Sequence, residues 1–293
     1  MAYAGCSPSM PSSPVPERWI ARAQPWLGTL VEVALPSGEA TETRFAAAFA
    51  AIEHVHRKMS PCDPASDLAR IRRVAQRRAV VVHSSTYAVL QLALSLHRQS
   101  GGAFDPTVAS AGISALRLQG RNRVRATAPI DIDLGGIAKG CAVDCAVAGL
   151  RAAGATAGLV NAGGDLRVFG TGVWTPVRLR HPGDPAIAAP LFEVQDAAVA
   201  TSGDYFCDGG NLVDRRARRI RRYAGSVSVV APSCMLADAL TKIVALAPAH
   251  APALLASYGA HAFRLHKAGG ELHCATTFSS PMPHLRLAPA LAA

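Results

Sequence analysis

Lysine is scarce in this chain. Among 30 Lys and Arg residues only four are lysine (Lys58, Lys139, Lys242 and Lys267), so arginine supplies nearly all of the formal net charge of +10. Such a composition indicates either a solvated basic surface or a preference for anionic ligands such as phosphates. Lys139 and Lys242 fall inside motifs that also contain glycines or carboxylates. This placement favours a local role at phosphate groups for these two lysines.

Disulfide, zinc-binding and membrane-spanning patterns are also lacking. The seven cysteines form no CxxC pair, and an odd number in a chain of 293 residues argues against a disulfide framework. No apolar run reaches membrane-spanning length. Half of the residues are hydrophobic and only 17% are charged, which excludes a largely disordered chain. The remaining class is a globular protein with a sizeable core.

The N-terminus lacks the basic start and apolar core of a signal peptide, and Cys6 lies too early to end a lipoprotein signal. Residues 1–20 are rich in Ser and Pro, so we expect a disordered leader there and the folded domain over residues 21–293. Without a targeting signal, we predict a cytoplasmic location.

Strand and helix patterns alternate irregularly along the chain. Strands are expected at residues 28–35, 78–83, 129–134, 157–163, 176–180, 197–203 and 226–232, and a closing hairpin at 261–266 and 271–277. Helices are expected at 43–60, 85–102 (capped by Ser84 or Ser85 and ended by Gly101), 141–155 and 234–248. Residues 204–224 break the pattern as a loop. This order indicates an α+β protein rather than a regular βαβ repeat.

The stretch "IDLGGIAKGCAVD" (132–144) predicts a strand, a glycine turn and a helix. A helix starting near Gly135–Gly136 would offer backbone N–H groups to an anion, and Lys139 would add a point charge. Asp133 could accept hydrogen bonds from a base, a ribose or a flavin edge. Alternatively the glycines form only a tight turn and Lys139 is solvated. The pattern is not GxGxxG, so a Rossmann nucleotide site is poorly supported.

The stretch "APSCMLADALTKIVAL" (231–246) places Asp238 inside an otherwise apolar helix. A carboxylate there needs a partner, because burying it unpaired is unfavourable. Thr241 and Lys242 lie three and four residues later, on the same helix face. Asp238 and Lys242 therefore form either an ordinary helical ion pair or part of a site for a hard cation such as Mg²⁺.

Two further segments are weaker when taken alone. In "GGAFDPTV" (101–108) the Asp-Pro pair indicates an extended turn, and Asp105 could simply stabilise it. "LVNAGGDLRVFG" (159–170) predicts a strand with a Gly-Gly bulge. For its polar residues Asn161 and Asp165, a structural role is at least as well supported as a functional one.

Together, these segments are similar to the ApbE-type family of FAD:protein FMN transferases. The resemblance runs from "PWLGTLVEV" through "KMSPCDPASDLARI", "GGAFDPTV", "IDLGGIAKGCAVD", "LVNAGGDLRVFG" and "AVATSGDY" to "SVSVVAPSCMLADALTK". It implies a two-lobed α+β fold with FAD in the cleft between the lobes. It also implies a Mg²⁺-dependent reaction that attaches FMN to a threonine or serine of an acceptor protein and releases AMP. Some members only bind or hydrolyse FAD.

The resemblance implies roles for individual residues. The positions matching FAD contacts are Met59, Ala103, Phe104, Asp105, Asp133 and Lys139. The metal positions are Gly136, through its carbonyl, and Asp238, through its carboxylate, with Thr241 as a third candidate ligand. We predict that Asp238 and Lys242 are catalytic, and that the partners are FAD and an acceptor protein.

Three positions depart from the family pattern. Lys242 stands where a threonine is common, Asn211 stands where a histidine suited to proton transfer is common, and Arg72 replaces a common asparagine. An ammonium beside a dication is repulsive, so Lys242 would weaken a metal site, replace its charge or contact a phosphate. Neutral asparagine cannot act as a general base, which makes His181 and His273 residues to test.

Two alternative functions differ in class from the transferase. One is a flavin-binding or FAD-hydrolysing protein that no longer transfers FMN. The other uses "RRARRIRR" (215–222) as a nucleic-acid-binding arm. That segment lacks interleaved aromatic residues and a known binding module, so we expect no nucleic-acid partner.

Overall fold

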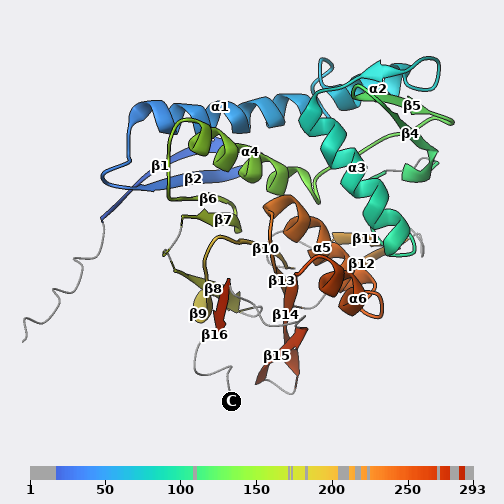
Figure 1. The fold of residues 1–293 in the computed structure, drawn as a ribbon. Coiled ribbons are helices and arrows are strands. Elements are labelled where there is room, and N and C mark those ends of the chain that lie inside the picture. Colours follow the sequence, from blue (N-terminus) through green and yellow to red (C-terminus); the bar gives the residue numbers. More distant parts are fainter. Residues whose placement is uncertain are drawn as a thin grey trace, which may run out of the picture.

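An antiparallel sheet of eight strands runs through the centre of the protein (Figure 1). The computed structural model describes residues 18–107, 111–170, 172, 174–181, 184–203, 211–214, 219–222, 225–268, 271–277 and 284–287. In spatial order the strands are β1 (Trp19–Trp26), β2 (Thr29–Pro36), β6 (Gly158–Ala162), β7 (Asp165–Phe169), β10 (Ala198–Gly203), β13 (Ser226–Ala231), β14 (His261–Ala268) and β15 (Glu271–Thr277). Strand β1 begins two residues before the predicted boundary at residue 21. The rest of the predicted leader, except Arg18, lies outside the described residues.

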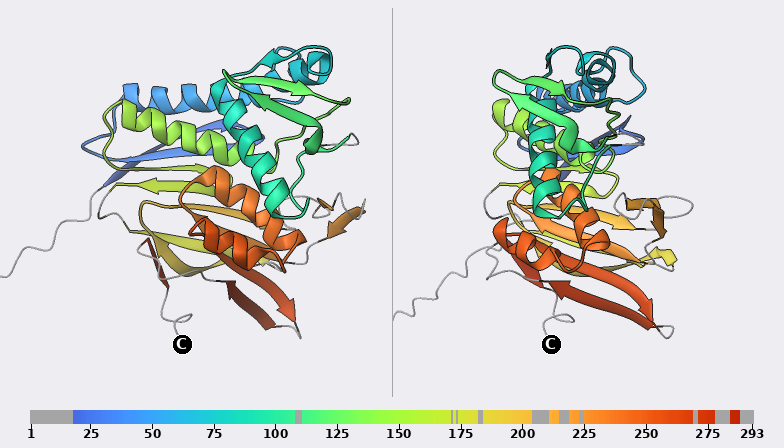
Figure 2. Two further views of the ribbon diagram at one scale, coloured as in Figure 1. Left: turned by 45° about the vertical axis from the view of Figure 1, so that its right-hand side comes forward. Right: turned by 90° about the vertical axis from the view of Figure 1, so that its right-hand side faces the viewer.

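Helices cover one face of this sheet. Helix α1 (Glu42–Met59) lies beside α4 (Ala138–Ala152) across the first strands, while α5 (Cys234–Leu246) covers β10 and β13 and is followed by α6 (Ala251–Ser257) (Figures 1 and 2). Helix α1 forms because Phe45, Phe49 and Ile52 recur at helical spacing and are buried, and because the Thr41 side chain accepts a hydrogen bond from the N–H of Arg44.

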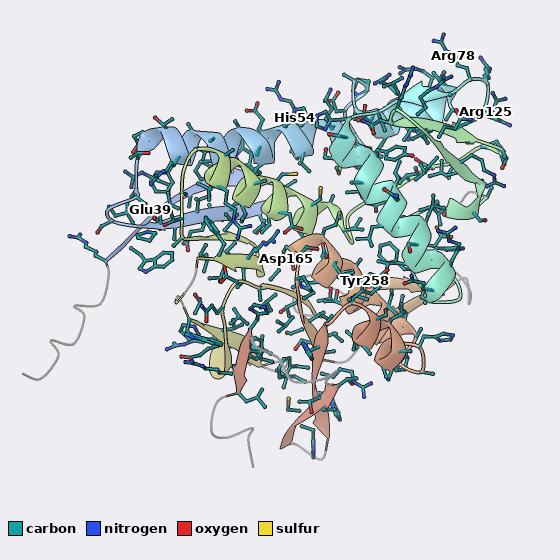
Figure 3. The ribbon with its side chains drawn as sticks, viewed as in Figure 1. Glu39, His54, Arg78, Arg125, Asp165 and Tyr258 are labelled. Carbon is teal, nitrogen blue, oxygen red and sulfur yellow. The ribbon has the colours of Figure 1, made fainter. Side chains whose placement is uncertain are left out.

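A smaller group of elements extends beyond the end of α1. It contains α2 (Asp67–Val74), β3 (Val80–Val81), α3 (Ser84–Gln99), the short 3₁₀ helix η1 (Ile113–Ala115), β4 (Leu116–Gln119) and β5 (Arg123–Ala126). Strands β3, β5 and β4 form their own sheet. Arg78 and Arg125 are exposed at the tip of this group, well away from Asp165 near the middle of the molecule (Figure 3). The basic surface therefore includes a region remote from the predicted site.

The opposite face of the central sheet packs against a second, three-stranded sheet. It consists of β16 (Leu285–Leu287), β9 (Asp184–Val194) and β8 (Thr175–His181). Strand β13 shows why both faces are covered. Val227 and Val229 join the core under α5, whereas Val230 joins the core shared with Phe192 of β9. Successive side chains of a strand point to opposite faces, so a strand buried on both sides has a continuous apolar sequence.

The structure confirms most predicted elements, including the helices at 43–60, 85–102, 141–155 and 234–248 within a few residues, and the closing β14–β15 hairpin. The strand predicted at 129–134 is wrong. Ile130, Ile132 and Leu134 are buried in alternation, but Ile132 makes only an isolated bridge to Thr107. Alternation reports which face of a segment is buried and does not guarantee a neighbouring strand.

Three smaller predictions are also corrected. Gly163–Gly164 is not a bulge but the turn between β6 and β7, where both residues have positive φ and Ala162 pairs with Asp165. Helix α3 is capped by the side chain of His83, which accepts from the N–H of Ser85, and not by a serine. The predicted loop at 204–224 contains a described two-stranded hairpin, β11 (Asn211–Asp214) with β12 (Arg219–Arg222).

In the described part of the chain, no helix combines the length and apolar character required to cross a bilayer.

Close contact between α4 and α5 depends on Gly140. A Cβ at this position would lie 2.3 Å from the backbone oxygen of Cys234. We expect Gly140→Ala to lower the free energy of unfolding by about 3 kcal/mol because the helices must separate, although alanine is otherwise favoured in helices. The measurement is urea unfolding, with Gly38→Ala as control because a Cβ there meets nothing within 4 Å. Equal stability of the two variants would contradict this helix contact.

Candidate functional site

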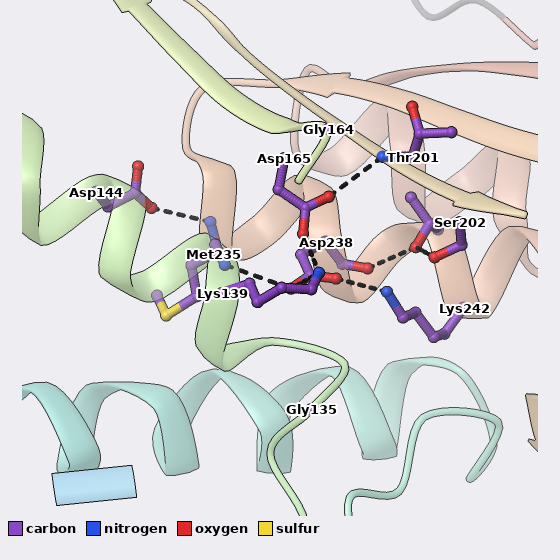
Figure 4. A network of polar contacts seen from close by, with 12 residues as sticks. Gly135, Lys139, Asp144, Gly164, Asp165, Thr201, Ser202, Met235, Asp238 and Lys242 are labelled. Atoms are coloured by element: carbon purple, nitrogen blue, oxygen red, sulfur yellow. Dashed lines mark hydrogen bonds and ion pairs between the residues drawn. The ribbon is translucent and has the colours of Figure 1, made fainter. Parts of the chain in front are cut away.

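Two carboxylates and two ammonium groups meet where α4, α5 and the central sheet come together (Figure 4). Lys139 lies in the first turn of α4 and pairs with Asp165, the first residue of β7. Asp238 and Lys242 lie one turn apart on α5, with 2.5 Å between Oδ1 and Nζ. The Lys139 Nζ is 3.9 Å from Oδ2 of Asp238, so it links the two carboxylates. We call these four residues the charge cluster.

The backbone around the charge cluster fixes both carboxylates. The turn at Gly163–Gly164 places Asp165 at the start of β7, where the N–H of Thr201 donates to its Oδ1 at 3.3 Å. The N–H of Gly140 donates to Oδ2 of Asp238, also at 3.3 Å. Both acids are therefore held by main-chain donors on neighbouring elements as well as by lysines.

Helix α5 is anchored to α4 near the cluster by a third acid. Asp144 accepts hydrogen bonds from the backbone N–H groups of Cys234 and Met235, at 3.0 and 2.9 Å, in the first turn of α5. A carboxylate at a helix N-terminus stabilises the unpaired N–H groups and the helix dipole. Asp144 also pairs with Arg167 on β7 at 2.6 Å. This network fixes the position from which α5 projects Asp238.

Burial and mutual charge set the protonation of the cluster. Burial and the nearby Asp238 raise the pKa of Asp165 to about 6, against the opposing effect of Lys139. Burial alone would raise the pKa of Asp238, but Lys242 and Lys139 outweigh it and hold that pKa below its ordinary value. Burial would lower the pKa of Lys139, yet the two carboxylates raise it. Lys139 and Asp238 are thus held in their charged forms.

Of the sequence-predicted metal residues, Asp238 and Gly136 lie against Lys242, and the side-chain donors of Asp238 and Thr241 do not fit a Mg²⁺ ion. Oδ1 of Asp238 pairs with Lys242, and Oδ2 faces the N–H of Gly140 and Lys139. The Thr241 hydroxyl donates to the backbone oxygen of Asp238 at 2.7 Å and bonds Ser202 at 2.8 Å. Mg²⁺ requires an octahedral set of oxygen ligands, whereas the predicted carboxylate and hydroxyl already bond protein groups. No cluster of three or more acidic, His or Cys side chains suited to a metal occurs among the described residues.

Two other predicted segments lie side by side next to the cluster. The N–H of Asp133 donates to the backbone oxygen of Pro106 at 2.8 Å, and Thr107 bridges Ile132. Asp133 is exposed, and its Oδ1 accepts a hydrogen bond from the N–H of Gly135 at 2.8 Å. The N–H of Gly135, which was predicted to face an anion, is therefore already bonded. Helix α4 begins only at Ala138, later than the predicted start near Gly135–Gly136. The glycine segment is therefore a loop leading into the helix and not its first turn.

The remaining predicted flavin contacts belong mainly to the interior. Met59, Ala103 and Phe104 are buried in one hydrophobic cluster. The carboxylate of Asp105 accepts from the N–H and hydroxyl of Thr107, at 3.1 and 2.7 Å, and from the N–H of Ile113 at 3.2 Å. These contacts show that the carboxylate of Asp105 is bonded to nearby residues of its own segment. Contact of these four residues with a flavin stays a prediction.

Among the candidate bases, His273 lies away from the charge cluster. His273 lies on β15 with its ring 5.6 Å from that of His266. Strand β15 is four strands from β7, which carries Asp165, or roughly 19 Å at ordinary strand spacing. The side chains of His181 and Asn211 lie outside the described part. Arg72 forms a half-exposed ion pair with Asp131 at 3.5 Å.

Sequence reasoning missed Asp165 as a site residue. It is buried with 2% side-chain exposure and contacts Lys139 directly. The signal in the sequence was the position of Asp165 immediately after Gly163–Gly164. A glycine turn between two strands places the next residue at the end of the sheet, and the glycines have no side chains to cover its carboxylate. This signal was overlooked because the glycine pair was interpreted as a bulge within one strand.

Comparison with known proteins identifies a family and several relatives of this chain. The sequence profile of the ApbE family matches residues 27–112 and 108–263. The FAD:protein FMN transferase of Vibrio cholerae serotype O1 is 28% identical over 229 residues, which are 64% of this chain and 69% of that protein. That of Rhodobacter capsulatus is 35% identical over 134 residues, or 42% of this chain and 26% of that protein.

Solved structures show the same fold. The flavin transferase ApbE from Vibrio cholerae gives a TM-score of 0.78 at 24% identity, covering 90% of this chain and 98% of that chain. The apo flavinyl transferase ApbE from Pseudomonas stutzeri gives 0.75 at 21% identity, covering 91% and 98%. With the family profile matched over most of its length and this α+β fold in common, the chain belongs to the ApbE family.

Proposed function

We propose that this protein transfers the FMN moiety of FAD to the hydroxyl of a threonine or serine in an acceptor protein and releases AMP. The observation that carries the proposal is the charge cluster. It fixes two ammonium groups, Lys139 and Lys242, beside the glycine loop that the family resemblance associates with the FAD phosphates. Relatives from Vibrio cholerae and Rhodobacter capsulatus carry the name FAD:protein FMN transferase, which supports the same reaction here.

In the proposed reaction, the acceptor oxygen attacks the phosphorus on the FMN side of the pyrophosphate. A new P–O bond forms, the bond from that phosphorus to the bridging oxygen breaks, and AMP leaves with the bridging oxygen. The hydroxyl proton passes to a base or to solvent. Positioning and neutralisation of phosphate charge supply most of the catalysis in such transfers, and a lysine ammonium is well suited to neutralisation.

The residues of the charge cluster differ in how they would contribute to positioning and to neutralising the phosphate charge. Lys139 and Lys242 would contact the phosphate oxygens, since each retains donors beyond those used for the carboxylates. Asp238, fully buried, holds both ammonium groups in place. Asp165 fixes Lys139 from the sheet. The exposed Asp133 would accept from the nucleoside. The Mg²⁺ that the resemblance implies enters no step, because the Asp238 carboxylate and the Thr241 hydroxyl already bond protein groups.

We further propose that FAD lies between the central sheet with its helices and the smaller group built on α2 and α3, as the two-lobed family fold implies. A cytoplasmic location is the accompanying proposal, and cell fractionation would check it.

AMP release from FAD by the purified protein tests this function, with and without an acceptor that the Vibrio cholerae relative modifies. We expect AMP release to accelerate when the acceptor is present. AMP formed at the same rate without any acceptor modification would identify FAD hydrolysis instead. Retained FAD with no AMP would identify a flavin-binding protein, provided the relative labels the same acceptor in parallel.

A further inference from the structure

Lys242 contacts two residues to which the family resemblance assigns a metal ion, Asp238 and Gly136. Its Nζ is 2.5 Å from Oδ1 of Asp238, the predicted metal carboxylate. Its stem packs against Gly136, the predicted carbonyl ligand, since a Cβ on Gly136 would lie 3.2 Å from Cε of Lys242. The lysine side chain therefore lies between the two predicted ligands, and Figure 4 shows it directed at Asp238 from the same helix.

The charges of the four cluster residues also sum to zero. Asp165 and Asp238 contribute two negative charges, and Lys139 and Lys242 contribute two positive ones. If position 242 held a neutral residue, the same site would carry one uncompensated negative charge, which attracts a cation. With Lys242 present, a divalent ion would enter a balanced site next to an ammonium group that repels it.

We propose that Lys242 replaces the divalent cation, so that this protein binds the pyrophosphate of FAD through two fixed ammonium groups without metal. The inference rests on the proposed function, because it takes FAD as the ligand. Lysine donates hydrogen bonds to phosphate oxygens as a compact point charge. Bonds between an ammonium and a phosphate are charge-assisted and stronger than neutral ones. Asp238 thus changes role from metal ligand to anchor for the substituting cation.

Binding measurements test this independently of transfer. The first measurement is the affinity of the protein for FAD, followed by flavin fluorescence in EDTA and then in excess Mg²⁺. The second is Mn²⁺ binding to the protein, followed by EPR with ADP as the pyrophosphate probe. For the unaltered protein we expect equal FAD affinity in the two conditions and no tightly bound Mn²⁺. Binding of FAD only when Mg²⁺ is present would overturn the proposal.

Two substitutions sharpen the test. Lys242→Thr supplies a hydroxyl in place of the ammonium, so we expect FAD affinity in EDTA to fall about tenfold or more, Mg²⁺ to restore it, and Mn²⁺ to bind. Lys242→Gln keeps the length without the charge and serves if the threonine variant does not fold. It should lose affinity in EDTA and gain from added Mg²⁺. Variants with unchanged affinity in EDTA would contradict the role of Lys242.

Failure of the proposed function gives a different pattern. A protein that binds FAD equally with and without Mg²⁺ but releases no AMP has lost transfer while keeping the metal-free site. A protein that binds FAD in neither condition is no FAD enzyme, and that outcome overturns both proposals.

Discussion

Asp238→Asn is expected to reduce AMP release to background and to lower the free energy of unfolding by about 3 kcal/mol. The Asp238 carboxylate is fully buried and is the common partner of Lys242 and Lys139. Without its charge, two ammonium groups face Asp165 alone, and removing one member of a buried ionic group leaves an uncompensated charge. The ammonium groups also lose the anchor that positions them for phosphate. Urea unfolding and chromatographic detection of AMP measure the two effects.

A double variant separates charge imbalance from lost chemistry. Asp238→Asn with Lys242→Met restores an equal number of positive and negative charges, so we expect it to recover about half or more of the lost stability. It should still release no AMP. Asp144→Asn is the control for the helix junction, since Asp144 accepts from α5 backbone N–H groups but contacts neither lysine. A double variant no more stable than Asp238→Asn would contradict the charge argument.

Lys139→Met is expected to weaken FAD binding by about 100-fold, the equivalent of one strong charge-assisted interaction, and to lower AMP release at least as much. Lys139 lies at the start of α4, beside the glycine loop, and links both carboxylates. Its loss removes a cation for the pyrophosphate and leaves the cluster with excess negative charge, which repels phosphate. Titration of flavin fluorescence measures the binding.

Two matched variants test whether the loss of FAD affinity is specific to Lys139. Arg73→Met makes the same change in net charge on the exposed surface of α2, and we expect FAD affinity to change less than about twofold because solvent screens such charges. Lys139→Arg keeps the charge but alters its geometry, so partial retention of binding is expected. Equal losses for Lys139→Met and Arg73→Met would show that general attraction, and not the cluster, binds FAD.

The sequence predicted well what local patterns determine. Helix α5 follows from its apolar character, and the pairing of Asp238 with Lys242 follows from their spacing on one helix face. The order of motifs also predicted the family before any geometry was known. Both kinds of inference depend on residues that are close in the chain or on a fixed order of segments.

Long-range contacts could not be read from the sequence. Lys139 pairs with Asp165, 26 residues later, because the β6–β7 hairpin turns back toward the start of α4. The amide of Gly135 was expected to face phosphate but bonds Asp133, since a short aspartate side chain readily reaches an N–H two residues later. Met59, Ala103 and Phe104 were assigned by resemblance, which does not reveal that their side chains are buried.

The most direct test of the proposed transfer is the intact mass of an acceptor protein after incubation with FAD and this protein, with AMP quantified in the same sample. The acceptor is one that the Vibrio cholerae relative modifies in a parallel reaction. We expect an acceptor heavier by one FMN moiety and AMP in equal molar amount. An acceptor of unchanged mass and no AMP, while the relative labels it, would contradict the proposed transfer.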